Sequence, residues 1–180
     1  MPARGARVGP LLGAVLVVLT AAGCTVMEGG AGPGAESRQA VTVIAVVDGD
    51  TVRAAPVGGG AELRVRILGI DAPETRDPDG RVECWAREST EFGRGMLLGR
   101  TVSLVGDPTQ DATDRYGRTL GYLLLGDGGN FSVLAAAAGA VRTYVYDRPV
   151  RADGAIRWAE AQAWAAGRGL WGACPVPAGR

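Results

Sequence analysis

The chain of 180 residues contains no histidine and no lysine, and it has only three cysteines. Without histidine there can be no Ser-His-Asp triad, no imidazole general base and no histidine-ligated zinc. The cysteines show no C-x-x-C spacing, which argues against a thiolate metal site. Any chemistry must therefore use carboxylates, arginines, tyrosines and, where a metal takes part, a metal that prefers oxygen ligands.

The first 23 residues have the pattern of a secretion signal, with a basic start, an apolar run over 11–19 and small residues at 20–23. The apolar run is too short to span a bilayer. Cys24 follows directly, so the segment resembles a bacterial lipoprotein signal, although Ala21 stands where leucine is most common. We expect an extracytoplasmic protein tethered to the membrane through lipidated Cys24. A plain secretory signal with soluble secretion is the alternative.

Residues 24–39 are rich in glycine and polar side chains, which predicts a flexible tether. Residues 40–174 are sufficient for one domain with a real core, and 175–180 form a short tail. There is no internal repeat and no sign of a second domain.

Two segments place acidic residues where apolar runs end. The first is Val47 to Thr51, with Asp48 and Asp50, and the second runs from Arg66 to Glu74. Carboxylates at strand ends, in turns broken by glycine and proline, are well placed to hold a hard cation. Each turn alone could be ordinary, because aspartate often hydrogen-bonds its own backbone in turns.

A third segment, Asp114 to Thr119, favours a functional site over ordinary turns. Together the three segments resemble the thermonuclease (staphylococcal-nuclease-like) family, whose pattern is V-x-D-G-D-T, then R-x-x-x-x-D-x-P-E, then D-x-Y-G-R. All three motifs occur here in order, and the resemblance runs from about Ala40 to Gly172. One D-G-D-T motif is a weak signal, whereas three motifs at compatible spacing are a strong one.

Apolar and alternating patterns predict five strands and three helices. The strands are 40–47, 51–55, 62–70, 101–105 and 118–125, and the helices are 84–98, 132–138 and 153–167. A helix between the third and fourth strands matches an oligonucleotide/oligosaccharide-binding (OB-fold) barrel, so the fold class is α+β and mainly β. Strict alternation would put Arg66 and Asp71 on opposite faces of the third strand. Their convergence requires a bend, for which Gly69 is the candidate.

The resemblance implies a role for each motif residue. It implies Asp50, Asp71 and the backbone carbonyl of Ala72 as Ca²⁺ ligands, although the family usually has threonine at the last position. It implies Glu74 as the residue that orients or deprotonates the attacking water. Arg66 and Arg118 match the phosphate clamp, a role that suits the planar guanidinium.

Other residues support this set. Asp48 and Thr51 are expected next to the ligands, orienting them or water. The tyrosines that match Tyr116 and Tyr144 lie beside the bound nucleotide in the family, and an aromatic ring can stack on any base. Arg115 stands where the family often has lysine, near a terminal phosphate.

Cys84 and Cys174 remain once Cys24 is set aside. Outside the reducing cytosol, two leftover cysteines in one domain usually pair. We expect a disulfide between them.

Charge gives a weaker indication of substrate. The chain has 19 arginines and 19 acidic residues. Removal of a leader that contains Arg4 and Arg7 would make the mature chain slightly acidic. Non-specific DNA-binding proteins are usually basic. The objection is weaker for an enzyme that clamps one phosphodiester with local arginines and a metal.

The resemblance thus implies a monomeric, calcium-dependent nuclease that cuts DNA and RNA with little sequence preference and leaves 3′-phosphate ends. No protein partner is indicated. The alternative is a catalytically inactive barrel that only binds nucleic acid or a surface partner.

Overall fold

The computed structural model describes residue 1 and residues 37–76 and 79–175. The segments from Ser37 onward belong to one compact unit. The predicted leader, Cys24, most of the tether and residues 176–180 lie outside the described residues. No helix in the described part of the chain is long and apolar enough to cross a membrane.

The core of the domain is a closed five-stranded barrel in the order β1-β2-β3-β6-β5. Its strands are β1 (Arg38–Val46), β2 (Thr51–Pro56), β3 (Leu63–Ile67), β5 (Thr101–Val105) and β6 (Thr119–Leu124). Only β3 and β6 pair in parallel, and the other neighbours are antiparallel. This is the predicted OB-fold architecture.

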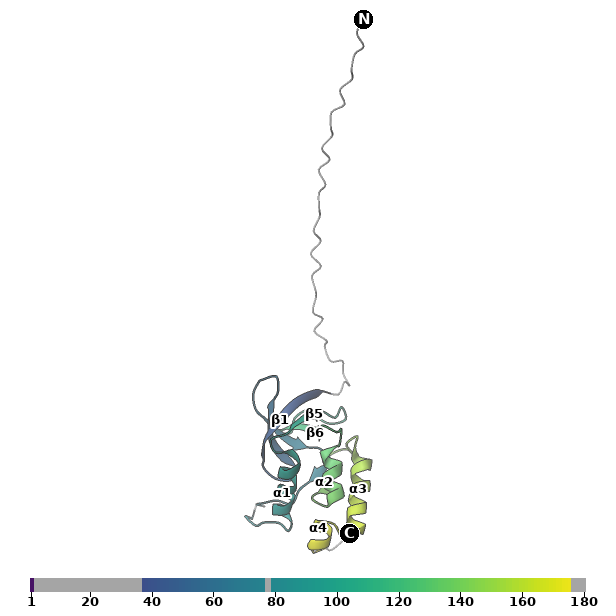
Figure 1. Cartoon of the computed structure of the whole chain (residues 1–180). Coiled ribbons are helices and arrows are strands. Elements are labelled where there is room, and N and C mark those ends of the chain that lie inside the picture. The colour runs from purple at the N-terminus through teal and green to yellow at the C-terminus, as the bar shows by residue number, and fades with distance from the viewer. Residues whose placement is uncertain (2–36, 77–78, 176–180) are drawn as a thin grey trace. The chain divides into compact units, whose positions relative to one another are not determined.

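The described residues also form four helices (Figure 1) and a short two-stranded ladder. The helices are α1 (Ala86–Leu97), α2 (Phe131–Ala138), α3 (Asp153–Ala165) and the four-residue α4 (Leu170–Ala173). The ladder pairs β4 (Ile70–Asp71) with β7 (Arg142–Thr143). As predicted, α1 lies between the third and fourth barrel strands in the sequence. In Figure 1, α2 and α3 lie side by side, with α4 beside their lower ends.

The barrel closes over side chains that alternate inward along its strands. Those with no exposed surface include Val41, Val43, Val52, Val65 and Leu123. Phe131 at the start of α2 is also fully buried, and its ring lies 6.0 Å from that of Phe92 on α1. Both helices are therefore anchored to the core that supports the strand ends.

Three predicted boundaries are corrected. β1 begins at Arg38, inside the predicted tether, because Arg38 and Gln39 pair through their backbones with β5. The third strand ends at Ile67 instead of residue 70, because the chain bends at Gly69 with a φ of 80°. The first helix begins at Ala86 instead of residue 84, after Trp85 in the left-handed region with a φ of 73°.

Candidate functional site

The turn between β1 and β2 carries the first acidic motif. The backbone N–H of Val47 donates to the carbonyl of Thr51 at 2.9 Å, which closes the turn. Asp48 Oδ1 accepts from the backbone N–H of Asp50 at 3.0 Å. Asp48 thus holds the turn that presents Asp50.

Gly49 lets this turn lie directly against α1. A Cβ atom at Gly49 would lie 2.0 Å from Ser89 Oγ and 2.8 Å from the Ala72 Cβ. Real Cβ atoms essentially never come that close, so only glycine fits. The D-G-D sequence therefore brings the acidic turn to both α1 and the second motif.

Asp50 is a buried carboxylate, only 6% exposed, whose two oxygens have different partners. Its Oδ2 accepts from the backbone N–H of Ala72 at 2.7 Å, and its Oδ1 accepts from Thr51 Oγ1 at 2.9 Å. Arg66 Nε lies 3.3 Å from the same Oδ1. Asp50 is the point where the first and second motifs meet.

Arg66 projects from β3 and is nearly buried, with a side chain 13% exposed. Its Nη1 donates to the carbonyls of Ile67 and Ile70 at 2.8 and 2.7 Å, and its Nη2 donates to Asp71 Oδ1 at 3.1 Å. A guanidinium has five N–H groups, so these bonds use three of them. Arg66 organises the acidic cluster, and it retains fewer donors for a phosphate than the motif alone suggested.

The bend at Gly69 makes this convergence possible. A side chain there would be strained by the positive φ, and its Cβ would lie 2.5 Å from Ile156 Cδ1. Ser132 Oγ on α2 donates to the carbonyl of Leu68 at 2.8 Å, which holds the bend against the helix. The predicted bend is therefore present, and β4 brings Asp71 back to Arg66.

The third motif folds around Asp114. Its Oδ1 accepts from the backbone N–H groups of Tyr116 and Arg118, each at 2.9 Å, and its Oδ2 accepts from Arg118 Nε at 2.7 Å. Arg118 Nη1 lies 3.5 Å from Thr51 Oγ1. Thr51 therefore connects Arg118 to Asp50.

The three residues expected beside the nucleotide lie at the exposed edge of this network. Tyr116 is 63% exposed, and the guanidinium carbons of Arg115 and Arg118 lie 4.8 and 5.6 Å from its ring centre. Arg115 Nη2 also donates to the Tyr116 hydroxyl at 2.7 Å. Tyr144 is exposed as well, with the Arg66 guanidinium carbon 5.9 Å from its ring centre. Both rings are open to solvent and flank the site arginines.

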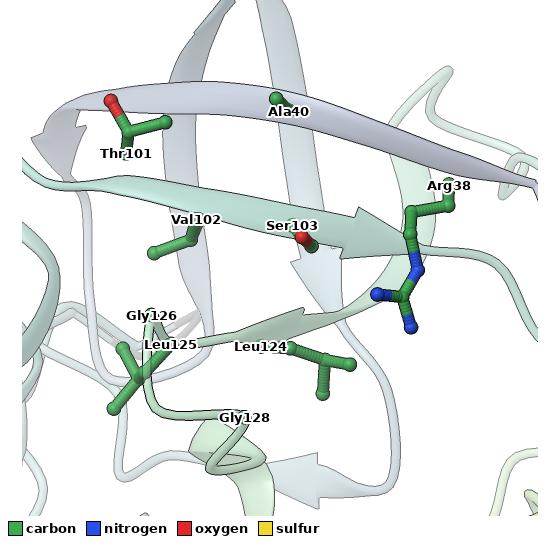
Figure 2. A pocket seen from close by; sticks show the side chains of 9 residues that line it. All are labelled: Arg38, Ala40, Thr101, Val102, Ser103, Leu124, Leu125, Gly126 and Gly128. Carbon is green, nitrogen blue, oxygen red and sulfur yellow. The ribbon is translucent and has the colours of Figure 1, made fainter.

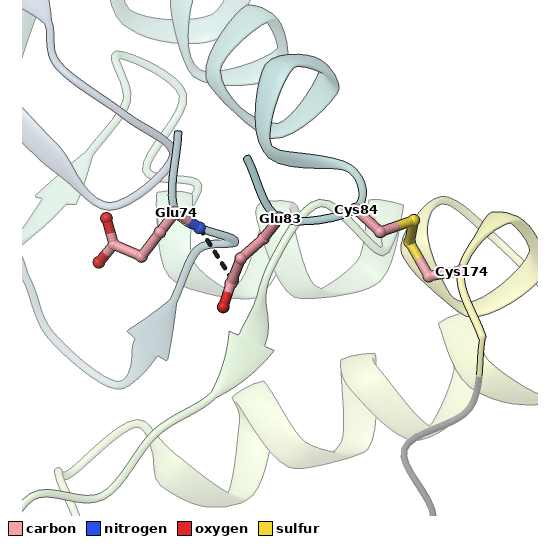
Figure 3. Close-up of a disulfide and its surroundings, with 4 residues drawn as sticks. All are labelled: Glu74, Glu83, Cys84 and Cys174. Atoms are coloured by element: carbon pink, nitrogen blue, oxygen red, sulfur yellow. Dashed lines mark hydrogen bonds between the residues drawn. A yellow bond between two sulfur atoms is a disulfide. The ribbon is translucent and has the colours of Figure 1, made fainter. Parts of the chain in front are cut away.

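Glu74 lies just beyond the buried pair Ala72 and Pro73, and its side chain is exposed. Its backbone N–H donates to Glu83 Oε2 at 2.9 Å (Figure 3). Its backbone carbonyl accepts from the N–H of Glu83, also at 2.9 Å. The position of Glu74 therefore depends on a residue that no motif contains.

A cavity of about 430 Å³ opens elsewhere on the barrel (Figure 2). It is lined by β1, β5, the end of β6 and the segment after it, including Arg38, Ser103 and Leu124. No residue of the three motifs lines it. The site is thus a surface of strand ends and turns, and this cavity is not part of it.

Comparison with known proteins agrees with this geometry. A family described as staphylococcal nuclease homologue matches residues 64–173, a span that includes Arg66, Asp71, Glu74 and Arg118. The chain belongs to the staphylococcal nuclease family.

Relatives in this family extend the similarity. A thermonuclease of Staphylococcus hyicus is 32% identical over 135 residues, which cover 75% of this chain and 77% of the relative. An uncharacterized endonuclease of Escherichia coli O157:H7 is 35% identical over 136 residues, which cover 75% and 79%. Endonuclease YncB of Bacillus subtilis (strain 168) is 30% identical over 108 residues, which cover 59% and 49%.

Burial and neighbouring carboxylates raise the pKa of three acidic residues of this site. Burial, followed by the charge of Asp50, raises the pKa of Asp48 to about 6. The pKa of Asp71 is raised by burial and by Asp50, although Arg66 opposes the shift. The pKa of Glu74 is raised by burial and by the charges of Asp50, Asp71 and Glu83. Around Asp71 and Glu74 the neighbouring carboxylates add to the effect of burial, and Arg66 only partly opposes them.

This cluster of carboxylates and its donor chemistry fit a hard cation. Asp50, Asp71 and the Ala72 carbonyl would supply oxygen ligands, which Ca²⁺ prefers. Among the described residues, no group of three or more acidic or cysteine side chains is arranged to hold a metal. Two carboxylates and one carbonyl are fewer than the six to eight oxygen ligands of Ca²⁺, so water would supply the rest.

Three residues of the site were not predicted from the sequence. Asp114 was within a recognised motif, but its role in fixing Arg118 depends on the turn geometry. Arg142 pairs with Asp71 across the β4–β7 ladder and lowers the pKa of Asp71, although burial and Asp50 outweigh it. Glu83 reaches Glu74 only because the chain doubles back, and no local pattern indicates that.

Proposed function

We propose that the protein is a calcium-dependent nuclease that hydrolyses DNA and RNA with little sequence preference. Its products would carry 3′-phosphate ends. Support comes from family membership and from relatives named thermonuclease and endonuclease. The inactive binding barrel remains the alternative that the experiment below distinguishes.

One observation carries the proposal: side chains from three distant segments form a continuous network. Thr51 links Arg118 to Asp50, and Arg66 links Asp50 to Asp71. A barrel that served only as a scaffold would have no need to place two arginines and two acids together at partly buried strand ends. Such a grouping suits the neutralisation and displacement of a phosphate.

The two arginines differ in their freedom to bind phosphate. Asp114 holds the Nε side of Arg118, and Thr51 contacts Nη1, whereas Nη2 makes no hydrogen bond within the described part of the chain. Arg118 would donate to a phosphate oxygen as charge develops there. Arg66 would hold Asp50 and Asp71 in place, and its remaining N–H groups would donate to the phosphate.

Glu74 would orient the attacking water and accept its proton. Its carboxyl group is exposed, and Figure 3 shows it pointing away from Glu83, so solvent can reach it. A raised pKa makes a carboxylate a better base, because its basicity moves toward the working pH. Bound Ca²⁺ would supply positive charge to the phosphate oxygens. Cleavage on the 5′-oxygen side of the phosphorus would leave the phosphate on the 3′ end.

Tyr116 and Tyr144 would hold the nucleotides on either side of the reacting phosphate. Stacking on an aromatic ring is tolerant of sequence because every base has a π-face. Arg115 would add positive charge at the same edge. This arrangement supports cleavage with little preference for base or sugar.

The test is digestion of plasmid DNA and a single-stranded RNA by the domain from residue 37 onward, with Ca²⁺ or with a chelator. We expect both substrates to be cut with Ca²⁺ only. Arg118→Ala should lose the activity, and Arg87→Ala, which changes an exposed arginine on α1, should keep it. Binding of DNA without cleavage under all conditions would favour the inactive barrel.

We further propose that the protein is a lipoprotein held outside the cytoplasm through Cys24. The support is the sequence of the leader, with small residues before the cysteine. The wild-type protein should enter the detergent phase on partitioning and carry an acyl mass at Cys24, and Cys24→Ala should abolish both. Soluble secretion of the wild type without an acyl group would contradict this.

A further inference from the structure

Glu74, the proposed base, has little to hold it on its C-terminal side. Ala72 and Pro73 before it are buried, but the described residues that follow it, 75, 76 and 79–82, are all exposed. A catalytic group must be held within about 0.5 Å of its working position. Some contact beyond the motif must therefore restrain the Glu74 backbone.

Glu83 provides that contact through two reciprocal hydrogen bonds. Its Oε2 accepts from the Glu74 N–H at 2.9 Å, and its own N–H donates to the Glu74 carbonyl at 2.9 Å. In Figure 3 the Glu74 carboxyl group points away from Glu83. The contact therefore fixes the Glu74 backbone and leaves its carboxyl group available.

Glu83 is itself held by a covalent bond on the next residue. Cys84 forms a disulfide with Cys174, which follows α4, with the two Cα atoms 5.9 Å apart (Figure 3). The disulfide matters because α1 has no side-chain cap at its start, where Trp85 adopts a left-handed conformation. Such a conformation persists only when neighbouring structure holds it in place.

The α4 end of this connection is firmly attached to the rest of the domain. Leu170 is buried, and its N–H donates to the carbonyl of Gly139, just after α2, at 2.9 Å. The N–H of Cys174 donates to the carbonyl of Leu170 at 3.0 Å. A continuous chain of contacts thus runs from α2 through α4 and the disulfide to Glu83 and Glu74.

We propose that Glu83 is a positioning residue for Glu74, and that the Cys84–Cys174 disulfide holds Glu83 in place. This inference rests on the proposed nuclease function. Glu83 would touch neither substrate nor metal, and its loss would misplace the base without weakening substrate binding. A displacement of about 1 Å at a reacting group can lower turnover by about 100-fold.

The central comparison is between Glu83→Ala and Glu83→Gln, assayed at about pH 9, where carboxylates are ionised. Glutamine keeps an oxygen that can accept from the Glu74 N–H. We expect Glu83→Ala to lower kcat by about 10- to 100-fold and to leave KM and Ca²⁺ affinity nearly unchanged. We expect Glu83→Gln to restore most of kcat. Glu91→Ala, which removes another exposed glutamate, on α1, is the matched control and should behave like wild type.

Two further measurements separate positioning from a general loss of structure. The Glu74 amide should be protected from hydrogen exchange in the wild type and in Glu83→Gln, and it should exchange faster in Glu83→Ala. The double variant Cys84→Ser/Cys174→Ser should show faster exchange at the same amide and a reduced kcat with unchanged KM.

The outcomes distinguish the two levels of the proposal. A wild-type protein that cuts neither DNA nor RNA would refute the nuclease function itself. If the wild type is active, normal kcat in Glu83→Ala would refute only the role of Glu83. Equal damage from alanine and glutamine would also refute it, as would an unprotected Glu74 amide in the folded wild type.

Discussion

Replacing Glu74 with glutamine keeps the size of the side chain and removes its basicity. Because Glu74 is proposed to act on water, Glu74→Gln should lower turnover by about 10²–10⁴-fold, the usual range for a general base. Ca²⁺ affinity, measured by calorimetry, should change little. Asp71→Ala should weaken both Ca²⁺ binding and turnover, because Asp71 is a proposed ligand. Near-normal cleavage by Glu74→Gln would show that another group handles the water.

The family resemblance indicated which acids and arginines would lie together, and the structure brings Asp50, Arg66 and Asp71 into contact. The resemblance could not predict how Arg66 would divide its hydrogen bonds. Its partners include the carbonyls of Ile67 and Ile70, which lie on either side of the bend and come together only after folding. Contacts made by backbone atoms cannot be predicted from the pattern of side chains. For the same reason Glu83 could not be found from the sequence.

At the scale of elements, the bend between β3 and β4 decides whether the site forms. Gly69→Ala combines a positive φ with a Cβ 2.5 Å from Ile156 Cδ1, so α3 or the bend must shift. We expect a loss of about 2–4 kcal/mol in stability from strain and overpacking together. Turnover should also fall, because Arg66 and Asp71 lie on opposite sides of the bend.

The matched control for this prediction is Gly58→Ala. Gly58 lies in a turn without a positive φ, and a Cβ atom added there would meet no other atom within 4 Å. Its thermal unfolding and turnover should remain those of the wild type. Equal stability of the two variants would mean that the bend tolerates a side chain.

Asp107, which follows β5, joins the barrel to the segment before α3. Its Oδ2 accepts from the Tyr122 hydroxyl at 2.7 Å and from the Arg151 N–H at 2.8 Å, and its Oδ1 accepts from the Thr109 N–H at 2.9 Å. Burial acts to raise the pKa of Asp107, but these hydrogen bonds outweigh it and the pKa is lowered. The ionised carboxylate is thus the form that stabilises the fold.

A lowered pKa fixes the direction of the pH dependence. The stability contributed by Asp107 should be fully present above its unfolded-state pKa of about 3.9 and lost as the pH falls through the folded-state pKa. Asp107→Asn should therefore cost about 1–3 kcal/mol at neutral pH. The cost should shrink in strong acid. Urea unfolding from pH 7 downward measures it, with Asp111→Asn, at an exposed aspartate, as the control. A cost that does not change with pH would contradict the conclusion that the ionised Asp107 carboxylate stabilises the fold.

The order of the predicted elements agreed with the structure, whereas several ends did not. The apolar run that begins at Ile67 continues through Gly69 to Ile70, so the sequence pattern alone could not show where the third strand stops. Arg38 and Gln39 are exposed, and they join β1 only through backbone pairing with β5. The pattern of apolar and polar side chains indicates which face of a strand is buried. It does not indicate backbone pairing at an exposed strand end.

At the scale of the whole molecule, barrel closure depends on contacts between distant segments. The parallel pairing of β3 with β6 closes the barrel and places Arg66 opposite Leu120, close to Arg118. The order of strands and helices predicted the barrel, but no local pattern specifies this parallel pairing. The disulfide was predicted by a different route, from the redox compartment and the number of cysteines, and the structure contains that pair.

The disulfide encloses most of the domain, because Cys84 and Cys174 are separated by 90 residues. In the chain-entropy account, closing a loop of this length stabilises the fold by about 4 kcal/mol, chiefly by restricting the unfolded chain. Cys84→Ser/Cys174→Ser should lower the free energy of unfolding by up to that amount. The dependence on guanidinium concentration should also steepen, since an open unfolded chain exposes more surface.

Guanidinium unfolding of the oxidised wild type, the reduced wild type and the double variant tests both effects. The reduced protein and the variant should share one midpoint and one slope, because each lacks only the cross-link. A lower midpoint with an unchanged slope would place the effect in the folded state, in contacts around α4 and the start of α1. Identical unfolding of the oxidised protein and the variant would mean that the barrel and its helices need no cross-link for their stability.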